Sequence, residues 1–245
     1  MNRKNFLSQI GTTFAALALA PNLISCVQKQ AQNIRGLKNW AGNYTYQADE
    51  VRYPQTVEEL AKLLKAQTKG KALGTQHCFN DIADTPGMQL STKNLNSIIE
   101  LNQVSSYVIV ESGIKYGDLG KELHSKGWAL HNLASLPHIS VGGSCATATH
   151  GSGVKNGNLA TALQGFELLT PGGDLLWVDP ETNSDLFYAG GVSMGALGIM
   201  TKVKLAIQPS FEVSQRVYEN LPMDVLKDNF DAIMSAGYSL SLIHI

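Results

Sequence analysis

The sequence has few cysteines, few aromatic residues and almost no net charge. Its 245 residues include 3 cysteines, with no pair in the CxxC spacing, which argues against a disulfide framework and against a structural zinc site. A formal net charge of −1 argues against a nucleic-acid-binding protein, which usually carries a basic surplus. The composition, 44% hydrophobic and 16% charged, is that of a folded protein rather than a disordered chain.

The amino terminus has the features of an export signal. Arg3 and Lys4 precede a short apolar run over residues 14–20. The run is shorter than the roughly 20 apolar residues that a membrane-spanning helix needs. Residues 3–7 also resemble a weakened twin-arginine signal, so export by either the general secretory or the twin-arginine route is open.

Two cleavage sites compete at the end of this signal. Residues 18–20 form an A-x-A pattern, but Pro21 follows it and disfavours cleavage there. Residues 23–26, Leu-Ile-Ser-Cys, resemble a bacterial lipobox, in which Cys26 would be acylated. We favour the lipobox, with an ordinary secretory signal and a chance cysteine as the alternative. The expectation is a signal over 1–25, lipidation at Cys26, a tether over 26–38, and an exported bacterial lipoprotein at the periplasmic side or cell surface, held to the membrane by the lipid alone.

Beyond residue 38, hydrophobic periodicity predicts interleaved helices and strands. Thr56 and Glu59 form a capping box that opens a helix, which Gly70 ends. Further strands are expected over 88–90, 107–110 and 200–207, a helix over 116–125, and a hairpin from 166–170 and 175–178 around a Gly-rich turn. The hairpin argues against a purely parallel sheet, so the expected class is α+β.

Residues 133–157 have no clean helical or strand period and are rich in Gly, Ser, Thr and His. Such a segment suits a ligand-binding loop with one short helix. It offers backbone N–H groups and hydroxyls without bulky side chains, which are the donors that a pyrophosphate needs. Together with His77, which follows a strand-like segment, it predicts the two walls of one cofactor site.

Two other motifs compete for the chemistry. Gly191-Val192-Ser193-Met194-Gly195 matches the G-x-S-x-G turn of serine hydrolases, but the only later histidine is His244 and the preceding residues form a poor strand. Residues 151–157 are one position away from the dinucleotide fingerprint of Rossmann folds, but no hydrophobic strand precedes them. We rank both below the cofactor-site interpretation.

The chain resembles the vanillyl-alcohol-oxidase superfamily of FAD enzymes, with its PCMH-type FAD-binding domain, and within it the alditol (xylitol) oxidases and sugar-1,4-lactone oxidases. The resemblance covers about residues 38–239, and its strings are long and in family order. They are Asn39-Trp40-Ala41-Gly42-Asn43, residues 73–85, residues 132–140, residues 146–153 and Gly195-Ala196-Leu197-Gly198.

The resemblance implies FAD as the cofactor, with His77 bonded covalently to the 8α-methyl carbon of the flavin. It implies that Ser135 contacts substrate and flavin, and that Ala134 leaves dioxygen a path to the flavin, as in an oxidase. Cys78 departs from the Ser that is usual in the family, and Gln76 from Arg or Gly. The full implied FAD-binding set is Gly74, Thr75, Gln76, His77, Cys78, Ser135, Ser140, Gly143, Thr147, Ala148, Thr149, His150 and Ile199. Trp40 is expected to be a packing anchor and His138 a hydrogen-bonded loop residue, and the histidine spacing fits no metal site.

The resemblance also implies the reaction. A polyol such as xylitol or sorbitol would pass a hydride to the flavin, and dioxygen would reoxidise it to give hydrogen peroxide. The alternatives are an oxidase or dehydrogenase of gulono- or arabinono-1,4-lactone, and a non-catalytic module that only holds flavin.

The expected domains are an FAD-binding domain over 39–209, with subdomains over about 39–110 and 111–209, and the truncated start of a substrate or cap domain over 210–245. Residues 240–245 resemble a translated sequencing adaptor, so we expect this tail to be artefactual. Amplifying the gene beyond codon 239 tests this, since a genomic stop codon directly after Ile245 would contradict it.

Overall fold

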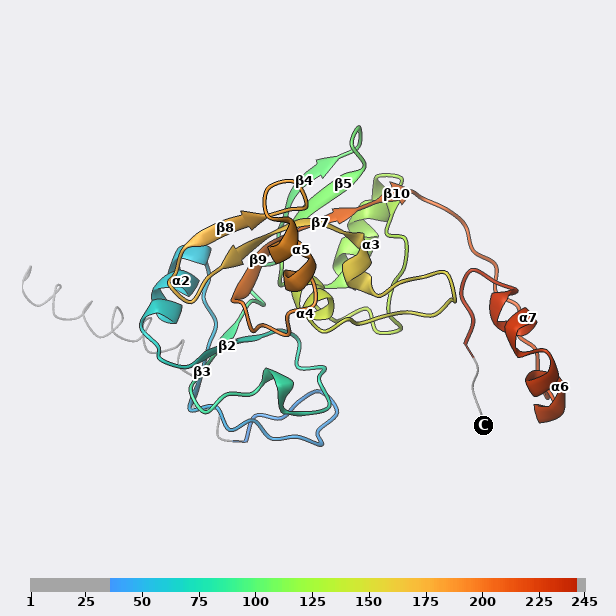
Figure 1. The fold of residues 1–245 in the computed structure, drawn as a ribbon, viewed down its shortest axis with the longest axis horizontal. Helices are drawn as coiled ribbons and strands as arrows, with labels where there is room; N and C mark the ends of the chain where they lie inside the picture. The colour runs from blue at the N-terminus through green and yellow to red at the C-terminus, as the bar shows by residue number, and fades with distance from the viewer. Residues whose placement is uncertain (1–35, 242–245) are drawn as a thin grey trace, which may run out of the picture.

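The computed structural model describes residues 36–241. The predicted signal, Cys26 and most of the tail over 240–245 lie outside this range. Within it, helices and strands interleave around two main sheets, which confirms the α+β class (Figure 1). No helix among the described residues is long and apolar enough to cross a membrane.

The first sheet is short and parallel. Its strands are β1 (Glu50–Arg52), β2 (Gly70–Leu73) and β3 (Met88–Ser91), in the order β1-β3-β2. All four residues of β3 are buried, as expected for the central strand of a covered parallel sheet. Helix α2 (Val57–Lys65) connects β1 to β2, and a turn of 3-10 helix (Asp81–Ala83) lies between β2 and β3.

The capping box of α2 is confirmed. The backbone N–H of Glu59 donates to Thr56 Oγ1 at 3.2 Å, and the Glu59 carboxylate accepts from the N–H of Gln55 at 2.8 Å. The predicted end of the helix was wrong. The helix stops at Lys65, and Gly70 opens β2, because the chain must extend there to pair with Met88 of β3.

The second sheet is antiparallel and has five strands. They follow the order β4 (Ile98–Asn102), β5 (Tyr107–Glu111), β9 (Ile199–Ala206), β7 (Leu163–Leu169) and β8 (Leu175–Val178). The predicted hairpin is confirmed as the β7–β8 pair, in which Phe166 faces Val178. Strand β4 was not predicted. Strand β4 pairs with β5, and β5 pairs with β9, so both belong to this sheet. The expected subdomain division after residue 110 put them with the first sheet.

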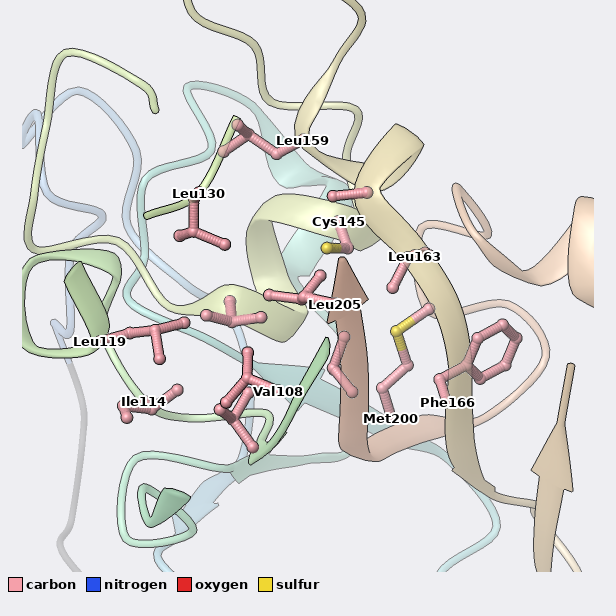
Figure 2. Close-up of a cluster of buried hydrophobic side chains, with 14 of the residues drawn as sticks. Val108, Ile114, Leu119, Leu130, Cys145, Leu159, Leu163, Phe166, Met200 and Leu205 are labelled. Atoms are coloured by element: carbon pink, nitrogen blue, oxygen red, sulfur yellow. The ribbon is translucent and has the colours of Figure 1, made fainter. Parts of the chain in front are cut away.

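Helices α3 (Tyr116–Ser125), α4 (Val141–Ala146) and α5 (Ser184–Gly190) pack on the second sheet. The predicted helix over 116–125 is confirmed, and α4 is the one short helix expected in the Gly-rich segment. A turn of 3-10 helix (Leu159–Ala162) leads into β7. The main core, drawn in Figure 2, combines Val108 of β5, Leu119 of α3, Cys145 of α4, Phe166 of β7 and Leu205 of β9.

A second apolar cluster joins the two sheets. Leu60 and Leu64 of α2 and Leu90 of β3 pack against Leu169 of β7 and Ile199 of β9. The two sheets therefore hold a fixed relation to each other. This relation brings the loop that follows β2 close to the segment that leads into α4.

The chain then leaves the second sheet. Strand β10 (Gln208–Pro209) pairs with β6 (Trp128–Ala129), and the chain continues to α6 (Met223–Asp228) and α7 (Phe230–Ser235), which lie to one side of the sheets (Figure 1). Large apolar side chains are exposed along this part: Phe211, Val213, Val217, Tyr218, Leu221, Met223, Val225, Phe230 and Tyr238.

Candidate cofactor site

The first wall of the site is the 74–79 loop that follows β2. Three groups from the Asn39–Asn43 segment hold it. The backbone N–H of Trp40 donates to the carbonyl of Gln76 at 2.8 Å, and the side-chain amides of Asn39 and Asn43 donate to the carbonyls of Cys78 and Phe79, both at 2.9 Å. Because these bonds satisfy backbone carbonyls, the loop has a defined shape without being part of a strand.

The second wall is the turn that opens α4. The backbone N–H of Ser140 donates to Thr75 Oγ1 at 3.2 Å, so the turn is tied directly to the 74–79 loop. The N–H groups of Val141 and Gly142 donate to the carbonyls of Ile114 and Ser112 at 2.9 and 2.8 Å. These bonds anchor α4 on the second sheet, and the loop anchored on the first sheet meets it there.

Two glycines face each other where the walls meet. The Cα atoms are close enough that a Cβ on Gly74 would lie 3.6 Å from Gly143 Cα, and a Cβ on either residue would come within 2.9 Å of Ser140 Oγ. Gln76, in the same loop, has a φ of 65°, in the left-handed region that non-glycine residues seldom adopt. Strained backbone of this kind clusters at ligand sites. The two walls therefore form a cradle of bare backbone.

Three aromatic rings from three separate segments gather at this cradle. The ring centroids of Trp40 and His77 are 4.9 Å apart, those of His77 and His138 are 4.7 Å apart, and those of Trp40 and His138 are 5.8 Å apart. We call these residues the three-ring cluster. Trp40 is 54% exposed, so the cluster lies at the surface of the described part and not in its core.

The cradle contains buried polar atoms without partners in the described part of the chain. His77 Nε2, His138 Nε2 and Ser140 Oγ are all inaccessible and make no hydrogen bond there. A buried polar atom without a partner costs about 1–3 kcal/mol, so three in one place indicate that a ligand supplies their partners. FAD fits this arrangement, because it carries a pyrophosphate and ring atoms that can serve as partners of these polar atoms. Burial, and after it the nearby His138, lower the pKa of His77 and keep its ring neutral.

Residues 147–150 follow α4 directly. The Thr147 hydroxyl donates to the carbonyl of Gly143 at 3.0 Å, and Ala148 has a φ of 53°. Thr147 and His150 are exposed, and Thr149 is half-buried. This bond is local to the end of α4, and a contact of residues 147–150 with FAD stays a prediction.

Other predicted site residues lie differently. Ser135 is exposed. The Ile199 side chain is buried against α2, so Ile199 could contact FAD only through its backbone. Cys78 is half-buried and Cys145 is buried in the main core, and both are free thiols that do not pair with each other. Burial raises the pKa of the Cys78 thiol, with Lys71 opposing the shift.

His138 lies in a loop, as predicted, but its Nε2 makes no hydrogen bond in the described part of the chain, and its ring contacts that of His77. The sequence carried one usable signal, since His138 stands two residues before Ser140 at the start of α4. Trp40 packs against other rings as predicted, but those rings are the histidines of the site.

The competing motifs do not have the required context. Gly191–Gly195 follows α5 and precedes β9, which is helix–turn–strand and the reverse of the nucleophile elbow. Residues 151–157 follow α4 and the 147–150 segment and have no strand before them, so the Rossmann fingerprint fails as well. Among residues 36–241, no group of three or more His, Cys, Asp or Glu side chains is placed to hold a metal ion.

We predict that FAD-free protein loses stability as the pH falls below about 6.5. Burial lowers the pKa of His77 and of His131 in the folded state below the ordinary histidine value of about 6.5. Between those lowered values and 6.5 the unfolded chain binds more protons, so unfolding is favoured as the pH falls. Thermal melts at pH 7.5, 6.5 and 5.5 measure this. His131→Gln should flatten the dependence, and an unchanged slope in that variant would contradict the assignment.

Comparison with known proteins also indicates an FAD-binding domain. The family described as FAD binding domain matches residues 48–179. An alditol oxidase from Streptomyces sp. is 42% identical over 208 residues, which are 83% of this chain and 49% of the relative. L-gulonolactone oxidase from Bos taurus is 32% identical over 81% of this chain and 46% of the relative.

A third relative is named as a dehydrogenase. L-gulono-1,4-lactone dehydrogenase from Mycobacterium tuberculosis is 33% identical over 71% of this chain and 41% of the relative. The chain therefore spans less than half the length of each of these three proteins.

Proposed function

Because this chain belongs to the FAD-binding domain family, we propose that it is the cofactor-binding part of an FAD-dependent oxidase of polyols such as xylitol or sorbitol. The observation that best supports this proposal is the 42% identity to an alditol oxidase, in a match that includes both walls of the cradle. Dioxygen is the proposed electron acceptor, and hydrogen peroxide the proposed second product. The first alternative is an oxidase or dehydrogenase of sugar-1,4-lactones, supported by relatives at 32% and 33% identity.

Bound FAD would supply the hydride acceptor for oxidation of the carbinol carbon. The residues of this chain bind and orient it. Gly74 and Gly143 let the two walls pack closely around Ser140 Oγ, which has no hydrogen-bond partner in the described part of the chain and could donate to the diphosphate. Thr147, Ala148, Thr149 and His150 continue the same wall.

We propose that His77 holds the flavin covalently. Its ring is kept neutral by burial and its Nε2 has no competing hydrogen bond in the described part of the chain, so a lone pair is free to bond to carbon. The bonds from Asn39, Trp40 and Asn43 fix the backbone on both sides of His77, which reduces the entropy lost when the bond forms.

We propose that residues 210–239 begin a substrate domain. The relatives are about twice as long as their matched part, and the exposed apolar side chains from Phe211 to Tyr238 are the surface that further chain would cover. Tyr238 already contacts the FAD-binding part, since its hydroxyl donates to the carbonyl of His131 and its own carbonyl accepts from Asn156 at 3.0 Å. The proposed domain would thus contact the FAD-binding part at His131 and Asn156.

The test uses the protein together with whatever follows residue 239 in its gene. Hydrogen peroxide release is measured with xylitol and sorbitol, and separately with gulono- and arabinono-1,4-lactone. Release with polyols only supports the proposal, whereas release with lactones only would replace it by the alternative. Turnover with an artificial dye but not with dioxygen would indicate a dehydrogenase. If FAD binds and no substrate reduces it, the chain is a flavin-holding module.

We propose that the protein is exported and anchored through acylated Cys26, on the basis of the lipobox-like Leu23-Ile24-Ser25-Cys26. Cys26→Ser should move the protein from the membrane fraction to the soluble periplasmic fraction and abolish incorporation of labelled fatty acid. Cys78→Ser is the matched control and should leave both unchanged. Equal fractionation of the Cys26→Ser variant and the unaltered protein would refute the anchor.

A further inference from the structure

The turn over 131–133 meets the loop over 151–156 at a junction that the proposed function leaves without a role. Asn132 Oδ1 accepts from the backbone N–H of Leu133 at 2.9 Å, and a Cβ on Gly151 would lie 2.6 Å from the same oxygen. The backbone of the loop therefore packs directly on the Asn132 side chain, which is buried. Neither segment belongs to a helix or strand, so contacts of this kind determine where the two segments lie.

The turn is not held by hydrogen bonds of its own side chains alone. His131 Nε2 and Asn132 Nδ2 are both buried and make no hydrogen bond in the described part of the chain. A buried polar atom without a partner costs about 1–3 kcal/mol, so two of them in adjacent residues oppose the conformation in which they are buried. Contacts from outside the turn must therefore stabilise it.

Tyr238 supplies such contacts to both segments of the junction. Its hydroxyl donates to the carbonyl of His131, and its own carbonyl accepts from Asn156 Nδ2 at 3.0 Å. Asn156 Nδ2 also donates to the carbonyl of Ser152 at 2.9 Å, and the hydroxyls of Ser152 and Ser239 are hydrogen-bonded to each other. One residue of the proposed substrate domain thus bridges the turn and the loop.

Tyr238 is also fixed from the side of its own segment. The ring of Phe211, near the start of that segment, lies 5.9 Å from the ring of Tyr238 at an angle of 57°. The Tyr238 side chain therefore has a ring packed against it and a hydrogen bond at its hydroxyl. A side chain held at both ends can transmit the position of one part of the protein to the other.

Both bridged segments are continuous with residues expected at the reaction site. The 131–133 turn is followed two residues later by Ser135, and the 151–156 loop follows the 147–150 segment directly. We propose that Tyr238 is a positioning residue, which fixes where Ser135 and the 147–150 segment lie relative to the flavin. The inference rests on the proposed function, because it concerns residues expected to contact flavin and substrate. Positioning matters at such a site, since a displacement of about 1 Å can cost about 100-fold in rate.

The experiment uses the protein together with whatever follows residue 239 in its gene, with FAD bound. Tyr238→Phe keeps the ring and the backbone carbonyl but removes the hydroxyl that donates to His131. Backbone hydrogen exchange, followed by mass spectrometry, should become faster in the peptide over 131–135. Anaerobic reduction of the flavin by xylitol, sorbitol or a 1,4-lactone, whichever reduces the unaltered protein, should become about tenfold slower, with the FAD content unchanged.

Two further variants make the test specific. Asn156→Ala removes the donor to the carbonyls of Tyr238 and Ser152, so it should speed exchange in the peptide over 150–157 and slow flavin reduction as well. Tyr107→Phe is the matched control, because it also removes one tyrosine hydroxyl bond, to Glu100 at 2.6 Å, but on strand β5. It should leave the exchange of both peptides and the rate of flavin reduction unchanged.

The two readouts separate positioning from a merely structural contact. Unchanged exchange over 131–135 in Tyr238→Phe would overturn the proposal, because the turn would not depend on the hydroxyl. Faster exchange with an unaltered rate of flavin reduction would also overturn it, since the turn would then move without effect on the reaction. If no polyol or lactone reduces the flavin of the unaltered protein, the proposed function fails and the positioning role fails with it. The exchange measurement needs no substrate, so it distinguishes that failure from loss of the Tyr238 contact itself.

Discussion

His77→Ala is expected to abolish covalent retention of FAD. Among residues 36–241, His77 Nε2 is one of three buried polar atoms of the cradle without a hydrogen-bond partner, and the surrounding backbone is fixed by bonds to Gln76, Cys78 and Phe79. Those bonds use main-chain carbonyls, so removal of the imidazole should leave the 74–79 loop in place. The measurement is flavin absorbance of the protein after acid precipitation and washing. The unaltered protein should stay yellow and the variant should be colourless.

The same variant should still bind FAD reversibly before denaturation. Gly74, Gly143 and Ser140 are untouched, and the Asn39 bond to the Cys78 carbonyl does not depend on the imidazole. His124→Ala is the control for loss of any histidine and should keep its colour. A His77→Ala protein that stays yellow after precipitation would refute the assignment of the linkage, and loss of reversible binding as well would indicate that the loop depends on the ring.

Elements with local signals were predictable from the sequence. The Thr56 capping box marks the start of α2, and the Gly-rich turn before Leu175 marks the β7–β8 hairpin. Strand β4 was missed because it is an edge strand with little burial, and an irregularity between Ile98 and Glu100 breaks the alternation that reveals a strand. In the first sheet, a strand was predicted over 88–90, within β3, and a strand-like segment before His77, where β2 lies. Strand β1 was missed because its three residues are too few for a period to be recognised.

The candidate site was predictable only in part. The strings around His77 and Ser140 identify two walls, and family resemblance gives their roles. The sequence alone does not show that the rings of Trp40, His77 and His138 are in contact. They come from separate segments that two different sheets hold in place. The cluster of Leu60, Leu169 and neighbouring residues joins the sheets, and no local pattern encodes that contact. The contact of His138 with His77 was therefore not predicted, although the neighbours of His138 were recognised.

Gly113→Ala is expected to be the most destabilising glycine substitution in the fold. A Cβ at this position would lie 1.9 Å from the carbonyl oxygen of Thr92 and 2.7 Å from that of Leu95. Both are backbone atoms, and the Gly113 N–H is itself bonded to the Leu95 carbonyl at 2.8 Å. Neither chain segment can therefore move aside without losing that bond. Thr92 follows β3 of the first sheet and Gly113 follows β5 of the second, so this close backbone crossing lies between the two sheets. A cost of about 3 kcal/mol, the upper end for added core atoms, should lower the melting temperature by about 10 °C.

Gly120→Ala is the matched control, seven residues away in the middle of α3. Nothing lies within 4 Å of its Cβ position. Because alanine favours the helix over glycine by about 0.5–1 kcal/mol, this substitution should raise the melting temperature by about 2 °C. The two changes are chemically identical, so opposite signs in parallel thermal melts isolate the close backbone crossing at Gly113 as the cause. Equal small effects from both would mean that the crossing is looser than described and that the two sheets are not held together there.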